Sequence, residues 1–590
     1  MRLLFTILSL IASFQTDARD IEISHLSGTR TIARVNGDKK YLLLPIEDAA
    51  PEAAVKVLAD AVLKCSFNAR LAVRQVDYLV PVDLESLRGK EILLDITLPK
   101  TESGAPGGDI LWTRLKTSDE FDTTNREAFR PAYHFSPAYG WMNDPNGMVR
   151  HNGLWHLFFQ YNPYGSVWGN MTWGHAVSKD LIHWDQWENA IFPDALGTIY
   201  SGSAVVDDDN SSGFGKDVIV AMYTSAGATQ TQSIAWSDDG GRTFKKYAGN
   251  PVIVAPRRDF RDPKVFKNTG TGLWNVVLAA GDEVQFWSSK NLREWTYESS
   301  FGKSYGSHAG VWECPDLFEL DGKWVLIVNV GSGGPAGGSA TQYFIGDFDG
   351  KAFVCDDAPE TVRWMDYGKD HYATVTWSGA PDGRKVALAW MSNWQYANSV
   401  PTKQFRSADS APRDLRLLVR GSERILVSSP SPEMEAIRGE GRAVKAAGRE
   451  TRLFPKARGA YELVFTYTPP KKGAAVITLS NDLGEKVVLS HDASAGTFTM
   501  DRRESGNVSF NKNFLAESTA PVRASGKVRL RVLADNSSIE IFGEDFCMTN
   551  LVFPSEAYNK VSVEGTKADI IVYPLQAQGG MASHFLTGRW

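Results

Sequence analysis

Most of the chain alternates short hydrophobic runs with turn-forming residues, a pattern that predicts strands. Near the start, Tyr41–Glu47, Tyr78–Asp83 and Ile92–Ile96 are three such runs. Between the first two, segment 51–63 is alanine-rich with Val and Leu at helical spacing, so we expect one short helix there. Residues 19–128 are therefore predicted to form a small N-terminal ancillary domain, mainly β, with a β-sandwich as the expected arrangement. Carbohydrate binding, packing and spacing are all open roles for it.

From about residue 133 to residue 427 hardly any segment has helical spacing, and one motif recurs. Ser178–Trp184 reads Ser-Lys-Asp-Leu-Ile-His-Trp, and Ser289–Trp295 reads Ser-Lys-Asn-Leu-Arg-Glu-Trp. Looser copies end at Phe244 and Phe353, so the closing aromatic residues are 60, 51 and 58 residues apart. This period suits a four-stranded blade. We therefore predict a five-bladed β-propeller catalytic domain over residues 129–432.

The last region, residues 440–578, returns to alternating strands separated by turns. Ala460–Phe465 and Val528–Leu533 are two of these strands, and their spacing predicts a C-terminal β-sandwich. Its acidic residues fall mostly at outward-facing strand positions, so we expect this domain to serve packing rather than chemistry. The predicted fold class of the whole chain is all-β.

The first 18 residues have the pattern of a secretory signal peptide. Arg2 supplies a positive charge, Leu3–Phe14 is an apolar core, and Thr16-Asp17-Ala18 is a passable cleavage site. The apolar run is too short to span a bilayer, so we expect no membrane span. A buried first helix is the alternative. The pattern favours a secreted protein that is periplasmic, cell-surface or extracellular.

Charge and cysteine content exclude several classes of function. The net charge is −6 and Lys and Arg are scattered, so neither nucleic acid nor an anionic membrane is an expected partner. The four cysteines are widely spaced and form no CxxC pair, so we predict no metal, no cofactor and no disulfide framework. Oligomeric state is left open.

The stretch Gly140–Gly147, Gly-Trp-Met-Asn-Asp-Pro-Asn-Gly, places one carboxylate on a stiff turn. Pro145 has a fixed φ and no N–H, and Asn-Gly after Asp-Pro is typical of a tight turn. Asp144 is therefore a candidate catalytic group. Alone, it is better explained as a turn residue that satisfies its own backbone.

Two further acids favour a catalytic role for Asp144 over a purely structural one. Asp262 lies beside Arg261, which is expected to hold it ionised, and Glu313 lies among apolar neighbours that disfavour its charged form. The three acids are 118 and 51 residues apart, close to two blade periods and one. Equivalent positions in the blades of a propeller converge on its central channel, so we predict that the three carboxyl groups meet in one pocket.

Glycoside cleavage needs this combination of groups. One carboxylate attacks or stabilises the anomeric carbon, and one carboxylic acid protonates the leaving oxygen. Asp144, among amide donors, suits the ionised nucleophile, and Glu313 suits the acid. Asp262 with Arg261 suits a clamp for sugar hydroxyls.

At these residues the chain resembles glycoside hydrolase family 32, which contains invertases, inulinases and levanases. The resemblance rests on Trp141–Gly147, Arg261-Asp262-Pro263 and Glu313-Cys314-Pro315, in this order. It covers about residues 131–577 and implies Asp144 as nucleophile, Glu313 as acid/base and Asp262 as transition-state stabiliser. It further implies fructose contacts, which we assign to Asn143, Gln160, Trp168, Ser201, Arg261 and Trp394. For Trp168 and Trp394 a place in the blade core is the alternative.

Segments Gly306–Gly310 and Trp390–Asn398 are most similar to exo-acting levanases and inulinases. The chain departs from the family at Phe405–Ala408 and Ala411–Leu415, where the family more often has Trp-Arg-Ser-Ala and Ile-Pro-Arg-Glu-Leu. This departure puts the fine substrate preference in doubt. The ancillary domain lies outside the match and is similar to an extra N-terminal domain of some fructan hydrolases.

The sequence thus predicts a secreted retaining β-fructofuranosidase that removes terminal fructose from levan or inulin, and from sucrose as a further candidate substrate. The partner is a fructan oligo- or polysaccharide. An endo-levanase or a fructosyltransferase on the same site is the alternative enzyme, and a fructan-binding lectin with an inactive site is the alternative from another class.

Overall fold

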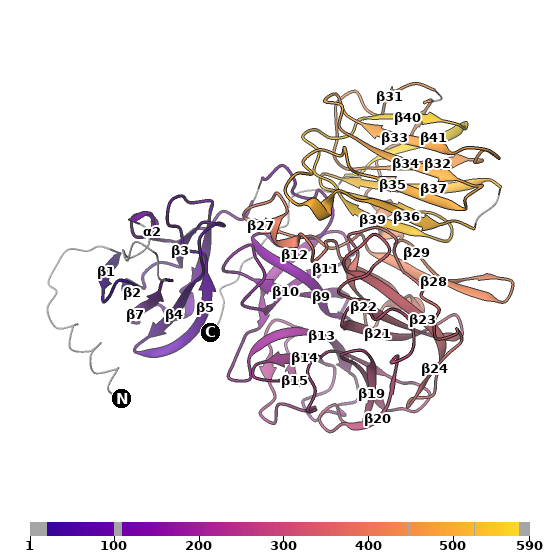
Figure 1. Ribbon diagram of the computed structural model, residues 1–590. Coiled ribbons are helices and arrows are strands. Elements are labelled where there is room, and N and C mark those ends of the chain that lie inside the picture. The colour runs from indigo at the N-terminus through magenta and orange to yellow at the C-terminus, as the bar shows by residue number, and fades with distance from the viewer. Residues whose placement is uncertain (1–19, 100–108, 125, 447, 524–525, 577–590) are drawn as a thin grey trace. The chain divides into compact units, whose positions relative to one another are not determined.

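The computed structural model describes residues 20–99, 109–124, 126–446, 448–523 and 526–576 (Figure 1). The predicted signal peptide lies outside these ranges. The chain divides after Asp122 into two compact units. In the part that the structure describes, no helix is long and apolar enough to cross a membrane.

The first unit contains two antiparallel sheets. One has the order β1-β2-β7-β4-β5, with bounds Ile21–His25, Arg30–Val35, Ile92–Thr97, Ala53–Ala59 and Val62–Ala69. The other has the order β6-β3-β8, with bounds Tyr78–Asp83, Tyr41–Ile46 and Lys116–Ser118. A 3₁₀ turn, Glu85–Leu87, and helix α2, Asp109–Arg114, complete the unit. The three predicted strands are β3, β6 and β7.

The helix predicted at 51–63 is wrong, because this segment forms most of the β4–β5 hairpin. Ala53, Val55, Val57 and Ala59 are buried on one face of β4, whereas Ala54 and Lys56 are exposed. That period-2 alternation fits a half-buried strand. Asp60 and Ala61 both have positive φ, 50° and 63°, as a tight two-residue hairpin turn requires. This turn lacks the usual Asn-Gly or Asp-Gly signal.

The second unit begins with five antiparallel sheets of a β-propeller, as predicted (Figure 1). The first strand of each blade contacts the first strand of the next, and β25 contacts β9, which closes the ring. A further short strand, β27, pairs in parallel with β9. Blade 1 contains β9 Gly140–His151, β10 Leu154–Asn162, β11 Thr172–Ser178 and β12 Trp184–Ile191, and β27 is Phe405–Arg406. Blade 2 contains β13 Thr198–Asp207, β14 Val218–Ala226, β15 Gln230–Ser237 and β16 Lys245–Lys246, and blade 3 contains β17 Phe260–Lys267, β18 Trp274–Ala280, β19 Val284–Ser289 and β20 Thr296–Phe301. Blade 4 contains β21 Trp312–Leu320, β22 Lys323–Val330, β23 Ala340–Phe348 and β24 Phe353–Cys355, and blade 5 contains β25 Tyr372–Thr376, β26 Val386–Trp390, β28 Arg413–Arg420 and β29 Glu423–Pro430.

The repeated motif builds the turn before the last strand of a blade. In blade 1, the Asp180 carboxylate accepts hydrogen bonds from the backbone N–H groups of residues 182 and 183. Trp184 donates its indole N–H to the Leu181 carbonyl, and Trp295 donates to Leu292 in the same way. In blades 1 and 3 the repeat therefore shapes the turn that precedes the last strand.

All five innermost strands have a register shift against the second strand of their blade at a similar depth. In each shift, one extra residue of the inner strand is accommodated as a β-bulge, which bends the strand and redirects side chains. The bulges fall at Asn143-Asp144, Ser201, Asp262-Pro263, Cys314-Pro315 and Ala373-Thr374. The three motifs that contain Asp144, Asp262 and Cys314 thus lie at bulges at a similar depth in their blades.

The predicted C-terminal β-sandwich is present as two six-stranded antiparallel sheets, orange to yellow in Figure 1. Short helical turns occur at Pro381–Gly383, Ala397–Ser399, α3 Glu433–Ala436 and Lys512–Phe514. The first sheet contains β30 Arg442–Val444, β41 Ala568–Pro574, β32 Tyr461–Tyr467, β37 Val528–Asp535, β38 Ser538–Phe542 and β39 Cys547–Leu551. The second contains β31 Thr451–Arg452, β40 Lys560–Glu564, β33 Ala475–Ser480, β34 Lys486–Asp492, β35 Thr497–Asp501 and β36 Glu517–Pro521.

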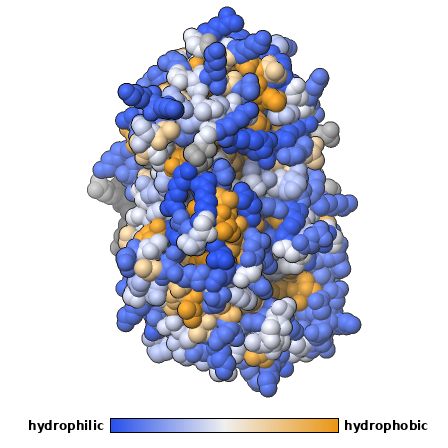
Figure 2. Space-filling model, turned by 90° about the vertical axis from the view of Figure 1, so that its right-hand side faces the viewer, coloured by the Kyte–Doolittle hydropathy of each residue, from blue (hydrophilic) through white to orange (hydrophobic). Residues whose placement is uncertain are grey.

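Polar side chains cover most of the face shown in Figure 2, and the apolar side chains there form separate patches. The larger apolar residues of the strands are buried between the sheets. Cys314, Cys355 and Cys547 carry free thiols.

The expectation that acids of the sandwich point outward is wrong for its most buried ones. Glu462 and Glu540 are fully buried. Glu462 pairs with Arg438 and Arg531, each at 2.6 Å. Both cations face it from other segments, so alternation along the strand gives no sign of the pairing. Burial of a carboxylate is tolerated only with such compensation.

Glu540 belongs to a second buried network that joins the sandwich to the propeller. Arg413 of blade 5 contacts Glu540 at 2.6 Å and Asp366 at 2.9 Å. His134 contacts Asp535 and Glu540 through its two ring nitrogens, both at 2.8 Å. Burial lowers the pKa of His134, but hydrogen bonds to the two carboxylates outweigh burial and raise the pKa to about 9. The ring is therefore an imidazolium at neutral pH.

This network predicts a loss of stability in mildly alkaline solution. The folded-state pKa of His134 lies above the unfolded value of about 6.5, so its contribution is complete below that pH and disappears as the pH rises through 9. We expect the thermal midpoint of the wild type to fall more between pH 6.5 and 9 than that of His134→Gln. The exposed His183 gives the matched control, His183→Gln, which should keep the wild-type slope. Equal slopes for wild type and His134→Gln would contradict the assignment.

Candidate active site

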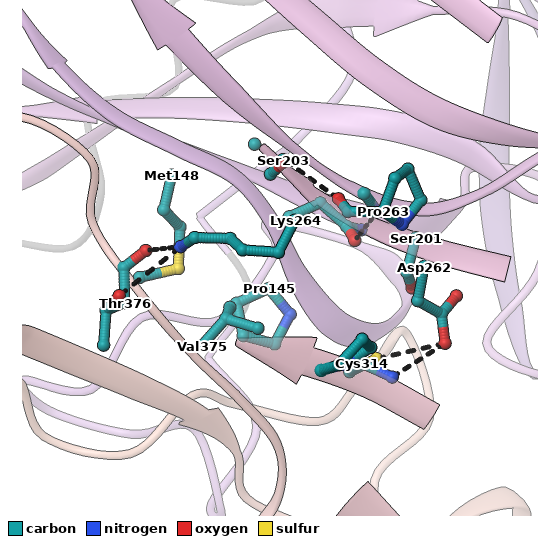
Figure 3. Close-up of a pocket in the computed structure, with 14 residues that line it drawn as sticks. Pro145, Met148, Ser201, Ser203, Asp262, Pro263, Lys264, Cys314, Val375 and Thr376 are labelled. Carbon is teal, nitrogen blue, oxygen red and sulfur yellow. Dashed lines mark hydrogen bonds between the residues drawn. The ribbon is translucent and has the colours of Figure 1, made fainter. Parts of the chain in front are cut away.

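The three predicted acids lie close together on three innermost strands, β9, β17 and β21. Cys314 lies between two of them, with its thiol 3.3 Å from Asp144 Oδ2 and 3.6 Å from Asp262 Oδ2. Glu313 precedes this cysteine. Figure 3 shows the Cys314 side chain and backbone both directed at the Asp262 carboxylate. The blade bulges thus bring three carboxyl groups to one end of the channel.

Asp144 is oriented by a chain of hydrogen bonds. The buried Trp141 donates its indole N–H to Asn143 Oδ1 at 2.8 Å, and Asn143 donates to Asp144 Oδ1 at 3.0 Å. The Ser201 hydroxyl of blade 2 donates to the other oxygen, Oδ2, at 2.6 Å. Donors on both oxygens fix the orientation of the Asp144 carboxyl group.

Asp262 differs from its expected state. It is almost fully buried and has a left-handed φ of 64°, an unusual conformation for a residue with a side chain. Burial raises its pKa to about 7; Arg261 opposes the rise, and Glu313 and Asp144 add to it. The prediction that Arg261 holds Asp262 ionised is therefore wrong, because burial among other carboxylates outweighs the guanidinium, whose Nε is 3.9 Å away.

The Arg261 guanidinium forms its hydrogen bonds with Glu313 rather than with Asp262. The guanidinium donates to Glu313 Oε1 at 3.0 Å from Nη2, and also to Asp259 and Gln230. The Tyr372 hydroxyl donates to the other carboxylate oxygen, Oε2. The polar partners of the Glu313 side chain thus come from neighbouring blades. The carboxyl group remains about one quarter exposed, which leaves it accessible from the pocket.

The structure places the predicted substrate-binding residues around these acids. Asn143, Ser201 and Arg261 contact the carboxyl groups directly. Gln160 on β10 is buried, and its amide nitrogen has no hydrogen-bond partner among the described residues. Because a buried unpaired amide is costly, this group is available for a ligand oxygen.

The two predicted tryptophans do not lie inside a blade core. Trp168 is 42% exposed and contacts Tyr200 edge-on at a centroid distance of 6.2 Å. Trp394 is partly buried and stacks on Trp141 at 6.0 Å. An exposed indole beside hydrogen-bonding groups suits the apolar face of a sugar ring.

A buried ion pair lies next to the acids. Lys264 donates to Asp316 Oδ2 at 3.0 Å and to the Thr376 carbonyl at 2.6 Å. Figure 3 shows its side chain crossing toward Thr376, away from Asp262. Lys264 and Thr376 line both the small cavity beside Asp262 and a larger pocket at the far ends of the inner strands.

Sequence reasoning missed Cys314 and Tyr372 as members of the site. Cys314 lies inside a quoted motif, and its proximity to Asp144 and Asp262 was not expected. Tyr372 precedes the bulge of blade 5 as Glu313 precedes that of blade 4. The blade period was the available signal for it.

Comparison with known proteins identifies the family. The model "Glycosyl hydrolases family 32 N-terminal domain" matches residues 134–430, and "Glycosyl hydrolases family 32 C terminal" matches residues 433–576. The chain belongs to glycosyl hydrolase family 32. Residues 27–133 match a separate model described as a domain of unknown function (DUF4980). The family therefore spans the propeller and the sandwich, and the ancillary domain is an addition to it.

Relatives of this family 32 chain include levanases and exo-inulinases. A levanase of Bacillus subtilis is 47% identical over 76% of this chain and 70% of the levanase. An extracellular exo-inulinase of Aspergillus awamori is 37% identical over 73% of this chain and 90% of that protein. The protein is a glycosidase.

Solved structures agree with this placement. The crystal structure of an exo-inulinase from Aspergillus awamori has a TM-score of 0.72 and 35% identity, covering 77% of this chain and 99% of that one. A fructofuranosidase from Schwanniomyces occidentalis, solved with fructose, has a TM-score of 0.70 and 34% identity, covering 77% and 99%. The predicted propeller and sandwich are therefore confirmed.

The state of Asp262 predicts a pH-dependent stability difference. Its folded-state pKa of about 7 lies above the unfolded value of about 3.9, so the wild type loses stability as the pH rises through this range. Asp262→Asn lacks this loss. We expect Asp262→Asn to be the more stable protein at pH 8, by on the order of 2 kcal/mol, and the difference to shrink toward pH 4. Thermal unfolding at both pH values checks this.

The exposed Asp282 of the same blade provides the control, because Asp282→Asn should show no comparable pH dependence. A difference between Asp262→Asn and wild type that stays constant from pH 4 to pH 8 would argue against a raised pKa.

Proposed function

We propose that the protein is a secreted, retaining β-fructofuranosidase that removes terminal fructose from fructans. The observation that supports this most is the pairing of two oriented carboxyl groups in one cluster. Asp144 accepts hydrogen bonds on both oxygens from Asn143 and Ser201, and Glu313 accepts on both from Arg261 and Tyr372 while its side chain stays about one quarter exposed. Two carboxyl groups fixed in one pocket are what the two roles in glycoside cleavage require.

The first step forms a covalent intermediate. Asp144 Oδ attacks the anomeric carbon of the terminal fructosyl unit, and the bond from that carbon to the leaving oxygen breaks. Glu313 gives its proton to the leaving oxygen, so the rest of the chain departs as an alcohol. In the second step Glu313 takes a proton from water, and the resulting oxygen nucleophile displaces Asp144 with release of fructose.

Asp262 and its neighbours bind the sugar in this mechanism. The Asp262 carboxyl faces the same pocket and hydrogen-bonds hydroxyl groups, most strongly as positive charge develops on the ring. Asn143, Gln160 and Arg261 supply further polar contacts, and Trp168 and Trp394 cover apolar ring faces.

The relatives support the substrate class. Their names are levanase and extracellular exo-inulinase, and one solved neighbour was obtained with bound fructose. The signal-like N-terminal pattern and the word extracellular in several relatives support secretion. Levan and inulin are therefore the first substrates to test, with sucrose as the short alternative.

Removal of either reacting carboxyl group provides the first test. Asp144→Asn and Glu313→Gln should fold normally and each lose at least a thousandfold in kcat, because each removes an obligatory group. Asp208→Asn, an exposed acid just beyond the far end of β13, should keep full activity. In the wild type, proton NMR should show β-fructose as the first product, and the carboxyl groups of Asp144 and Glu313 should lie about 5–5.5 Å apart in a crystal structure. Inversion, or substantial fructose release by either variant, would contradict the mechanism.

Product analysis decides between the candidate activities. Incubation with levan, inulin and sucrose should release free fructose from the start, without intermediate oligosaccharides, as chromatography with reducing-sugar detection will show. Early oligosaccharides from levan would indicate an endo-levanase, and longer products from sucrose a fructosyltransferase. Binding to levan without any release of reducing sugar would indicate the lectin alternative.

A further inference from the structure

A group of buried polar atoms without hydrogen-bond partners among the described residues lies around Trp390 and Asp409. Both carboxyl oxygens of Asp409 and the indole N–H of Trp390 are buried and have no hydrogen-bond partner among the described residues. The same holds for the hydroxyls of Ser392, two residues after Trp390, and of Ser407, two residues before Asp409. Such groups carry a desolvation cost unless something pairs with them.

Backbone pairing places Asp409 directly opposite Trp390. The two residues form an antiparallel bridge, with hydrogen bonds from Met391 N to Ala408 O and from Ser410 N to Ala389 O. Opposed residues of an antiparallel pair direct their side chains to the same face. The carboxyl group and the indole therefore lie on the same face, and no direct hydrogen bond joins them.

Trp390 packs against the supports of both reacting acids. Its ring lies 6.0 Å from Trp141, which holds Asp144 through Asn143. It also lies 6.3 Å from Tyr372, whose hydroxyl donates to Glu313. A rotation of the Trp390 ring would consequently displace both carboxyl groups.

Asp409 has the chemistry to satisfy the indole. Burial, together with the nearby Asp144, raises its pKa well above the ordinary range, and His134 opposes this only weakly. This direction favours the protonated form of Asp409, which has one donor and further acceptor positions. A single buried water can accept from the indole N–H and exchange hydrogen bonds with this acid.

We propose that Asp409 is a positioning residue for the reaction, which holds the Trp390 indole through a buried water and so fixes the ring that packs between the supports of Asp144 and Glu313. The proposal rests on the proposed roles of these two acids. It assigns no contact with the substrate to Asp409.

A double-mutant cycle on fructose release tests the coupling. Asp409→Leu should lower kcat/KM about tenfold, mainly through kcat, because it leaves the indole N–H unpaired and free to reorient. Asp409→Asn keeps a donor and an acceptor and should stay within about threefold of wild type. In a Trp390→Phe background, which has no N–H to hold, Asp409→Leu should change kcat/KM less than about twofold.

Three kinetic outcomes would overturn the proposal: wild-type kcat/KM in Asp409→Leu, equal losses in both backgrounds, or an Asp409→Asn loss as large as that of Asp409→Leu. A crystal structure of the wild-type chain decides independently, and also if Asp409→Leu fails to fold. We expect an ordered water within hydrogen-bond distance of both Trp390 Nε1 and Asp409. Its absence would refute the proposal. Failure of the proposed function is distinct, because it shows as a wild type without fructose release.

Discussion

A β-bulge at a similar depth in every innermost strand is the constraint on which the site depends. A regular strand directs neighbouring side chains to opposite faces, so it cannot present two consecutive residues to one pocket. The bulges relax this rule at one depth in all five blades. Asn143 and Asp144, and likewise Arg261 and Asp262, take part in the same cluster for this reason. The left-handed φ values of Asp262, Cys314 and Ala373 are the local strain that accompanies the arrangement, and the surrounding sheets must maintain it.

The bulges also concentrate negative charge, and the remaining structure compensates for it. Burial raises the pKa of Asp262 to about 7, and the carboxyl groups of Glu313 and Asp144 add to this rise against the Arg261 guanidinium. Donors arrive from separate blades: Ser201 from the second, Arg261 from the third, Cys314 from the fourth and Tyr372 from the fifth. No single blade provides a working set. A site of this kind lowers the free energy of unfolding. The hydrophobic cores of the large propeller and sandwich compensate for this loss.

The sequence predicted those elements whose hydrogen bonds join residues close together in the chain. The turn motif ending at Trp184 and Trp295 predicted the blades, because its hydrogen bonds lie within a few residues. Pairings between distant segments were not accessible: Glu462 looks like an outward strand residue until Arg438 and Arg531 are placed beside it. The segment at 51–63 failed for a different reason, since alternate alanines and valines fit a helix and a strand equally well. The three acids were predicted to meet at equivalent positions of their blades. In the structure, the residue of blade 3 equivalent to Glu313 is Arg261, one residue before Asp262, and only the strand register around the bulges reveals this shift.

That one-residue shift explains why the two acids of the later blades differ. Glu313 occupies the position before its bulge and reaches across to Arg261, the equivalent residue of the neighbouring blade. Asp262 occupies the bulge itself, where the backbone N–H of Cys314, the equivalent bulge residue of blade 4, contacts it at 2.8 Å. Each acid is thus paired with its structural counterpart one blade away. The two acids also differ in exposure, because the Glu313 side chain is about one quarter exposed and Asp262 is almost fully buried. An exposed carboxyl group can exchange protons with a leaving group and with water, whereas a buried one is suited to holding a ligand in place.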